Sequence, residues 1–235
     1  MTSKSSARGD GPAPDPPREA ASSQASPVVN TRYASIRRRV LGIRLPIVAL
    51  LLIVDAALVW RYYADNEYLY ELSRQFISDD QSPSEMAVSA VDHLRGKLRD
   101  RGEPGPFLSP AFEFLRPPPR EVAERGGDCA DRSRLLITLL NLRGVRASKM
   151  ALYDHEQRSR HAVVTIDIER GKEMVVDALF GLYFPKPSGG YYWVGDLTKD
   201  EGILRDRIEQ EIAGGEDGFR PRLKKYPYEQ YTYLE

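Results

Sequence analysis

Residues 160–178 read RHAVVTIDIERGKEMVVDA, and this stretch decides the fold. Apolar and polar side chains alternate on both sides of Arg170-Gly171, which is the pattern of two β-strands joined by a tight turn. We expect antiparallel strands over residues 161–168 and 173–178, and a further strand over residues 145–153. The sequence therefore predicts an antiparallel sheet built around this hairpin.

The residues before the sheet predict a helix with the only cysteine of the chain at its start. The helix, residues 130–143, has one apolar face, made by Leu135, Leu136, Leu139 and Leu140. Cys129 directly precedes it and follows Gly126-Gly127-Asp128. The N–H groups at a helix start stabilise a thiolate, and glycines allow a substrate backbone to approach. This placement suits a nucleophilic cysteine.

Cys129, His161 and Asp177 form a possible set of nucleophile, base and orienting residue. Spacing alone leaves a structural interpretation open: a buried cysteine, a hydrogen-bonded strand histidine and a turn aspartate. The pairing register of the two strands distinguishes the catalytic from the structural interpretation, because side chains along a strand alternate between its two faces. A regular two-residue turn at Arg170-Gly171 would direct Asp177 away from His161. We predict a bulged or odd-length hairpin over residues 169–172, with Gly171 left-handed and His161 directed at Cys129.

Three segments resemble the transglutaminase-like superfamily: PREVAERGGDCADRSRLLITLLNLRGVRASKMALYD (119–154), RHAVVTID (160–167) and EMVVDALFG (173–181). The resemblance implies an α+β fold with a papain/transglutaminase-like core, a Cys-bearing helix packed on an antiparallel sheet. It also implies Cys129 as nucleophile, His161 as general base and Asp177 as the residue that orients the base. The Cys129 N–H is a candidate oxyanion donor by analogy. Many members have an aromatic residue where this chain has Val163, so the cleft is expected to differ in shape.

The superfamily includes cysteine peptidases, amidases, acyl-transferring cross-linkers and inactive members, so the resemblance does not fix one function. Our first hypothesis is a membrane-anchored cysteine hydrolase or acyltransferase that acts on peptide or amide bonds, with a peptide or protein substrate. It needs no cofactor and no metal. The alternative is a non-catalytic binding module that holds a peptide or an envelope polymer in the same cleft.

Residues 45–60, LPIVALLLIVDAALVW, are long and apolar enough for a transmembrane helix. Asp55 opposes insertion by about 2.5–3.5 kcal/mol, but the Leu, Ile and Val residues together favour it by about 3–6 kcal/mol. Arginines cluster before the run and an aromatic belt of Trp60, Tyr62 and Tyr63 follows it, which favours a cytoplasmic N-terminus. A buried helix of a soluble domain ranks second and a cleaved signal peptide third.

These patterns divide the chain into three parts. We expect a disordered cytoplasmic tail over residues 1–31, where proline recurs and large apolar side chains are scarce. A basic flank and a signal-anchor helix occupy residues 32–63, and a transglutaminase-like domain outside the cytoplasmic membrane occupies residues 64–235. Within the domain, capping boxes at residues 82–85 and 198–201 each predict a helix start.

The remaining polar and aromatic candidates have simpler interpretations. His93 is expected to be a surface or half-buried structural histidine, and His155, in a polar loop, is a less suitable base than His161. The aromatic run 191–193 could line a substrate groove but fits a strand packed on the core better. An added edge strand is preferred over a partner-gripping role for the C-terminal tyrosines, Tyr226, Tyr228, Tyr231 and Tyr233.

Composition excludes several protein classes. The chain has 34 basic and 34 acidic residues, and this zero net charge argues against a nucleic-acid-binding protein. One cysteine excludes an intramolecular disulfide and any zinc site with two or more thiolates. We find no carboxylate cluster of the kind that calcium needs.

Overall fold

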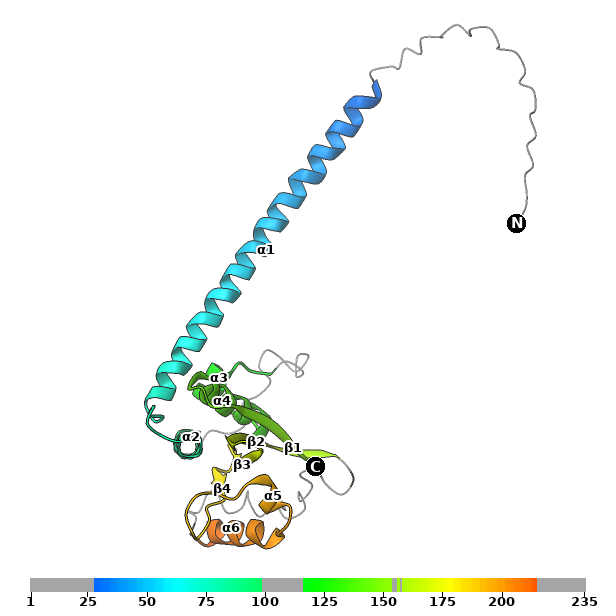
Figure 1. Cartoon of the computed structure of the whole chain (residues 1–235). Helices are drawn as coiled ribbons and strands as arrows, with labels where there is room; N and C mark the ends of the chain where they lie inside the picture. The colour runs from blue at the N-terminus through cyan, green and yellow to red at the C-terminus, as the bar shows by residue number, and fades with distance from the viewer. Residues whose placement is uncertain (1–27, 99–115, 154–155, 157, 215–235) are drawn as a thin grey trace, which may run out of the picture. The chain divides into compact units, whose positions relative to one another are not determined.

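The computed structural model describes residues 28–98, 116–153, 156 and 158–214, with side chains from residue 45 onward (Figure 1). The chain divides into two compact units, Met1–Ala57 and Leu58–Glu235. The expected tail up to residue 27, His155 and the four C-terminal tyrosines lie outside the described residues.

One long helix, α1 (Val28–Arg74), contains the apolar run, and the boundary between the two units falls within it. It begins at Val28, inside the segment that the sequence assigns to the tail. From Leu45 onward it is long and apolar enough to cross a membrane, and no part of its most apolar window is buried in protein. Its exposed side chains in residues 45–63 are those that a lipid environment would cover. The prediction of one apolar N-terminal helix is therefore confirmed.

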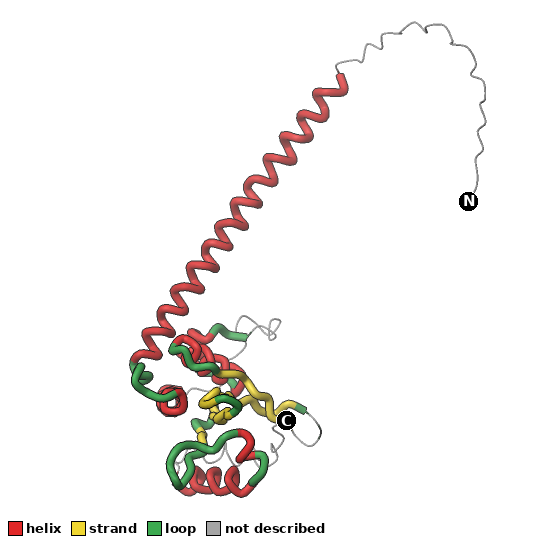
Figure 2. The backbone as a smooth tube through the Cα atoms, in the orientation of Figure 1, coloured by secondary structure: helices red, strands yellow, loops and turns green. Residues whose placement is uncertain are grey.

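In the second unit, four antiparallel strands form one sheet in the order β1-β2-β3-β4; Figure 2 draws the strands in yellow. Their bounds are β1 Ala147–Tyr153, β2 Ser159–Glu169, β3 Lys172–Asp177 and β4 Leu182–Tyr183. The β2–β3 turn has Gly171 at φ 77°, and the register shifts between Asp167 and Glu169. The predicted bulged hairpin with a left-handed Gly171 is confirmed.

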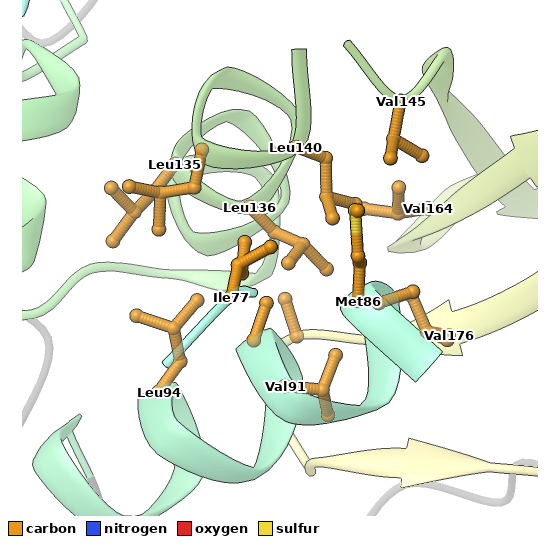
Figure 3. Packing of buried hydrophobic residues seen from close by; sticks show 14 of the residues in the cluster. Ile77, Met86, Val91, Leu94, Leu135, Leu136, Leu140, Val145, Val164 and Val176 are labelled. Atoms are coloured by element: carbon orange, nitrogen blue, oxygen red, sulfur yellow. The ribbon is translucent and has the colours of Figure 1, made fainter. Parts of the chain in front are cut away.

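Helices α2 (Pro83–Leu98), α3 (Pro119–Arg125) and α4 (Cys129–Leu142) form a core with one face of the sheet. Val164 of β2 and Val176 of β3 pack there with leucines of α4 and with Val91 of α2 (Figure 3). Leu69 and Leu72, near the end of α1, belong to the same core. The capping box at residues 82–85 is confirmed, because the backbone N–H of Ser82 donates to Glu85 at 2.8 Å and that of Glu85 donates to Ser82.

A second core lies on the other face, where Val163 of β2 and Val175 of β3 pack with α5 (Val194–Leu197) and α6 (Glu201–Gly214). The capping box predicted at residues 198–201 is wrong. Thr198 lies in the turn after α5, where its hydroxyl donates to the Gly195 carbonyl. Asp200 instead accepts the N–H of Gly202 at the start of α6, at 2.9 Å, because an aspartate directly before a helix reaches those N–H groups better.

The unit is thus an α+β domain with helices on both faces of an antiparallel sheet, as the sequence predicts. The Cys-bearing helix α4 contacts β1 and β2. Assignment of this arrangement to a papain/transglutaminase-like core stays a prediction.

Candidate active site

Cys129 is the first residue of α4 and is half-buried. Asp128 is the N-cap, and its Oδ1 accepts the backbone N–H of Asp131 at 2.9 Å. Aspartate is a favourable N-cap because its carboxylate accepts a hydrogen bond from an N–H group that has no acceptor within the helix. The cap therefore fixes the turn that carries the thiol.

The side chain of the buried Arg132 fixes the loop that precedes Cys129. Nε of Arg132 donates to the Gly127 carbonyl at 2.9 Å, and its Nη2 donates to the Leu98 carbonyl of α2 at 3.1 Å. A Cβ on Gly127 would lie 2.6 Å from the Cβ of Asp131, so the loop passes too close to α4 for any larger residue. This close approach is the structural reason for the second glycine of the Gly126-Gly127 pair.

His161 and Asp177 form a buried pair across neighbouring strands. Nε2 of His161 lies 2.6 Å from Oδ2 of Asp177, and both side chains are fully buried. The other carboxylate oxygen, Oδ1, accepts the N–H groups of Leu179 at 2.8 Å and Phe180 at 3.0 Å. Asp177 is thus both a turn residue and the partner of the histidine. The Phe180 ring packs on the imidazole, with centroids 5.5 Å apart.

The electrostatics of His161 connect this pair to the thiol. Burial lowers the pKa of His161, but the charge and hydrogen bond of Asp177, and those of Cys129, raise it to about 10. Nε2 of the ring faces Asp177, and the interaction with Cys129 places the thiol close to the same ring. The structure therefore brings the three predicted site residues together, and an imidazolium is the stable form of the ring at neutral pH.

The pairing between β2 and β3 ends before His161, and a hydrogen bond from α4 is made to β2 in this region. The last residues that β2 and β3 pair are Val164 and Val176. Beyond them, the Ala162 carbonyl of β2 accepts a hydrogen bond from the Ser133 hydroxyl of α4 at 3.2 Å. Ser133 lies one helical turn after Cys129, so this buried bond ties the thiol-bearing turn to the residue next to His161.

Charged groups flank the thiol on its own helix. Asp131 is buried, and burial together with the charge of Asp128 raises its pKa. Arg116 forms an ion pair with Asp128, and its Nη1 lies 3.6 Å from Oδ2 of Asp131. Sequence reasoning missed Arg116 because it lies 13 positions before Cys129 in a proline-rich segment with no periodic pattern.

Sequence reasoning also missed Arg132 and Ser133. Both are buried polar residues on a helix whose other buried positions are mostly leucines. Their spacing of three and four residues from Cys129 puts them on its side of the helix, which is the signal that could have identified them.

Other candidates lie outside the site or have structural roles. His93 is half-buried and stacks on Phe76 at 4.1 Å, as a structural histidine would. Tyr191 packs against the core on the α4 side of the sheet, and Tyr192 packs against the core on the α6 side. Trp193 forms an isolated antiparallel β-bridge with Met174 of β3. Within the described residues, no group of three or more His, Cys, Asp or Glu side chains could hold a metal ion.

Comparisons with known proteins add no relative: the chain matches no protein-family model, no curated protein and no solved structure.

Proposed function

We propose that the protein is a membrane-anchored cysteine hydrolase or acyltransferase that acts on peptide or amide bonds through Cys129, His161 and Asp177. One observation carries the proposal: a buried His161–Asp177 pair whose imidazole also interacts with a cysteine at a helix start. A buried ion pair is by itself weak support, because structural networks also shift pKa values. Here the third member is a half-buried thiol at the positive end of a helix, where a nucleophile would be stabilised.

The proposed chemistry uses the protonated imidazole of His161 beside the cysteine. The Cys129 thiolate attacks the carbonyl carbon of an amide, a C–S bond forms, and the carbonyl oxygen becomes negatively charged. The His161 imidazolium then gives its proton to the leaving amine as the C–N bond breaks. Water or a second amine, deprotonated by His161, then attacks the acyl carbon; the C–S bond breaks, the acyl group leaves as an acid or a new amide, and the Cys129 thiolate and His161 imidazolium are restored. Asp177 holds the ring in one orientation throughout.

The backbone N–H of Cys129 is our candidate donor to the developing oxyanion. It lies in the first turn of α4, where N–H groups have no acceptor within the helix. In the same turn, the Asp131 N–H already binds the Asp128 cap and is therefore occupied. Electrostatic stabilisation by such donors is a large part of catalysis in acyl transfer.

We further propose that α1 anchors the protein in the cytoplasmic membrane by a single pass, with residues 64–235 outside. The support is the exposed apolar stretch of α1 together with the arginines that precede it in sequence. The envelope peptides and polymers that this side of the membrane holds are then the substrates to test first.

The test compares full-length wild type with Cys129→Ala on a panel of envelope peptides, with and without an added primary amine. Mass spectrometry of products distinguishes hydrolysis from transfer, and an acyl adduct on Cys129 identifies the nucleophile. We expect no turnover by Cys129→Ala or Cys129→Ser. Activity in Cys129→Ala would disprove the nucleophile assignment.

A second pair of variants tests the base. We expect His161→Gln to be inactive, since glutamine can still donate to Asp177 but cannot exchange a proton with the thiol. The matched control is His155→Gln, the same change at a histidine that lies between β1 and β2 in the sequence. Loss of activity in His155→Gln alone would move the base to that residue.

A further inference from the structure

Cys129 lies between two carboxylates, and this arrangement opposes its proposed role. Asp128, the N-cap, directly precedes the thiol, and Asp131 follows it by two residues in the first turn of α4. Negative charges close to a thiol disfavour the thiolate. His161 supplies one opposing positive charge, but Asp177 already partners it.

Arg116 is placed to offset both carboxylates. Its guanidinium pairs with Oδ2 of Asp128 and lies 3.6 Å from Oδ2 of Asp131. The segment that carries it is fixed on α4, because Arg134 donates to the carbonyl of Pro117, the next residue. One cation from a separate segment thus serves two carboxylates on the helix that carries the thiol.

Among the described residues, one other arginine lies near these carboxylates, and the charged groups of α3 have other partners. Nη2 of Arg134, in α4, lies 4.0 Å from Oδ1 of Asp131, so this arginine also offsets part of the negative charge beside Cys129. In α3, Arg125 pairs with Glu121, and Arg120 pairs with Glu124 and with Asp65 of α1. In α2, Arg95 pairs with Glu211 of α6. Within the part of the chain that the structure describes, Arg116 is therefore the cation that contacts both carboxylates beside Cys129.

We propose that Arg116 is a positioning residue of the cysteine site, which holds the Asp128 cap and neutralises Asp128 and Asp131 so that Cys129 stays reactive near neutral pH. This inference rests on the proposed function and names a residue that regulates its nucleophile. The hydrogen bond with Asp128 raises the pKa of Arg116, and the charges of Asp128, Asp131 and Cys129 act in the same direction. A negative charge on Cys129 therefore stabilises the same cation that Asp128 and Asp131 stabilise.

The experiment measures the rate of alkylation by iodoacetamide from about pH 5 to pH 10 on the full-length protein in detergent micelles. Cys129 is the only cysteine, so the total label reports on this one site. We expect Arg116→Gln to move the midpoint of the profile upward by roughly 0.5–1 pH unit, a rate loss of roughly 3- to 10-fold below the midpoint. Arg116→Lys keeps the charge and should recover most of the reactivity.

Two further variants separate charge from structural damage. Arg120→Gln is the matched control, because Arg120 is similarly exposed and pairs with two carboxylates, Asp65 and Glu124, that do not flank the thiol. Its profile should equal that of wild type. Asp128→Asn keeps a good helix cap but removes one negative charge, so the double variant Arg116→Gln/Asp128→Asn should return toward the wild-type midpoint. Simple misfolding would not be reversed by a second substitution.

The outcomes distinguish this inference from the proposed function. A wild-type midpoint well below that of a free thiol, with an unchanged profile in Arg116→Gln, overturns the role of Arg116 and leaves the nucleophile intact. A wild-type midpoint equal to that of a free thiol contradicts the proposed function itself. If Arg116→Gln does not fold, Asp128→Asn alone decides: a midpoint at or below that of wild type supports the charge argument, and a higher midpoint overturns it.

Discussion

Nε2 of His161 lies 2.6 Å from Oδ2 of Asp177, on neighbouring antiparallel strands and fully shielded from solvent. This contact exists because the hairpin between the strands carries one bulge, which puts both side chains on the same face. The same carboxylate accepts two backbone N–H groups from the turn that follows β3. Asp177 is therefore a structural and an electrostatic residue at once, and the two roles can be separated.

Asp177→Asn and Asp177→Ala should have different consequences. Alanine leaves the N–H groups of Leu179 and Phe180 and the His161 ring without their acceptor, which should lower the free energy of unfolding by about 2–5 kcal/mol. Asparagine keeps an oxygen for the two N–H groups, so the domain should fold. Its activity should fall by about 10²–10⁴-fold but not to zero, because the ring loses its anionic partner. Denaturant unfolding and turnover measure the two effects.

The control for this pair is Asp167→Asn, the same change at an exposed position of β2. It should alter neither stability nor activity beyond about 0.5 kcal/mol. Equal activity of Asp177→Asn and wild type would leave the His161–Asp177 pair with a structural role only.

The pKa of His161 predicts how stability depends on pH. The folded-state pKa is raised to about 10 from an ordinary value of 6.5, by Asp177 and Cys129 against the opposing effect of burial. A raised folded-state pKa means that the folded protein holds the proton more tightly. Its stabilisation is complete below about pH 6.5, falls as the pH rises from there, and is lost above about pH 10.

This dependence can be measured in the Cys129→Ser background, where the thiol no longer titrates. The free energy of unfolding, minus that of Cys129→Ser/His161→Gln, should fall as the pH rises above about 6.5, with a slope of at most about 1.4 kcal/mol per pH unit, and should level off below about pH 10, because serine removes the Cys129 contribution to the raised pKa of His161. A flat difference from pH 6 to pH 10 would show that the ring is not protonated in the folded state.

The hairpin and α4 were predictable because local rules decide both. Alternation fixes the strands, Gly171 adopts the left-handed conformation that the bulged turn needs, and Leu135 to Leu140 repeat with helical spacing up to Gly144. The environment of Cys129 was not predictable in the same way. Arg116 and Ser133 act on residues 12 to 29 positions away in sequence, so only tertiary packing reveals their partners.

Helix boundaries were the other weak point. The short helix α3 begins at Pro119, within a segment whose three successive prolines indicate a loop. Proline at the first helical position is compatible with a helix, and here the rest of the turn follows from packing of Val122 and Ala123 in the core. At residues 198–201 the capping pattern is present in the sequence, but Thr198 is the C-cap of α5 and its hydroxyl donates to the Gly195 carbonyl.

The topology of the anchor can be tested without knowledge of the substrate. A reporter that is active only outside the cytoplasm, fused after Glu235, should be active, and a cytoplasm-only reporter at the same place should not. Replacing Arg37, Arg38 and Arg39 by Asn should weaken this orientation, because the positive charges before the span retain the N-terminus in the cytoplasm. The reverse pattern in the unaltered protein would contradict both the orientation and the proposed place of action.

Gly127→Ala should disturb the cysteine site from within the loop. A Cβ at residue 127 would lie 2.6 Å from the Cβ of Asp131 and 3.3 Å from its Oδ2, so either α4 or the loop must shift. The Gly127 carbonyl also holds Arg132, so the displacement should reach a second buried contact. We expect a loss of about 1–3 kcal/mol in the free energy of unfolding and slower alkylation of Cys129.

Gly96→Ala provides the contrast, since a Cβ there, in the last turn of α2, meets no described atom within 4 Å. Alanine has the higher helix propensity, so this variant should be more stable than wild type by about 0.5–1 kcal/mol, with an unchanged alkylation rate. Opposite signs for two Gly→Ala changes in one domain would assign the Gly127 effect to steric contact with Asp131. If Gly127→Ala is instead as stable and as reactive as wild type, the loop does not hold Cys129 in the fixed position that the site requires.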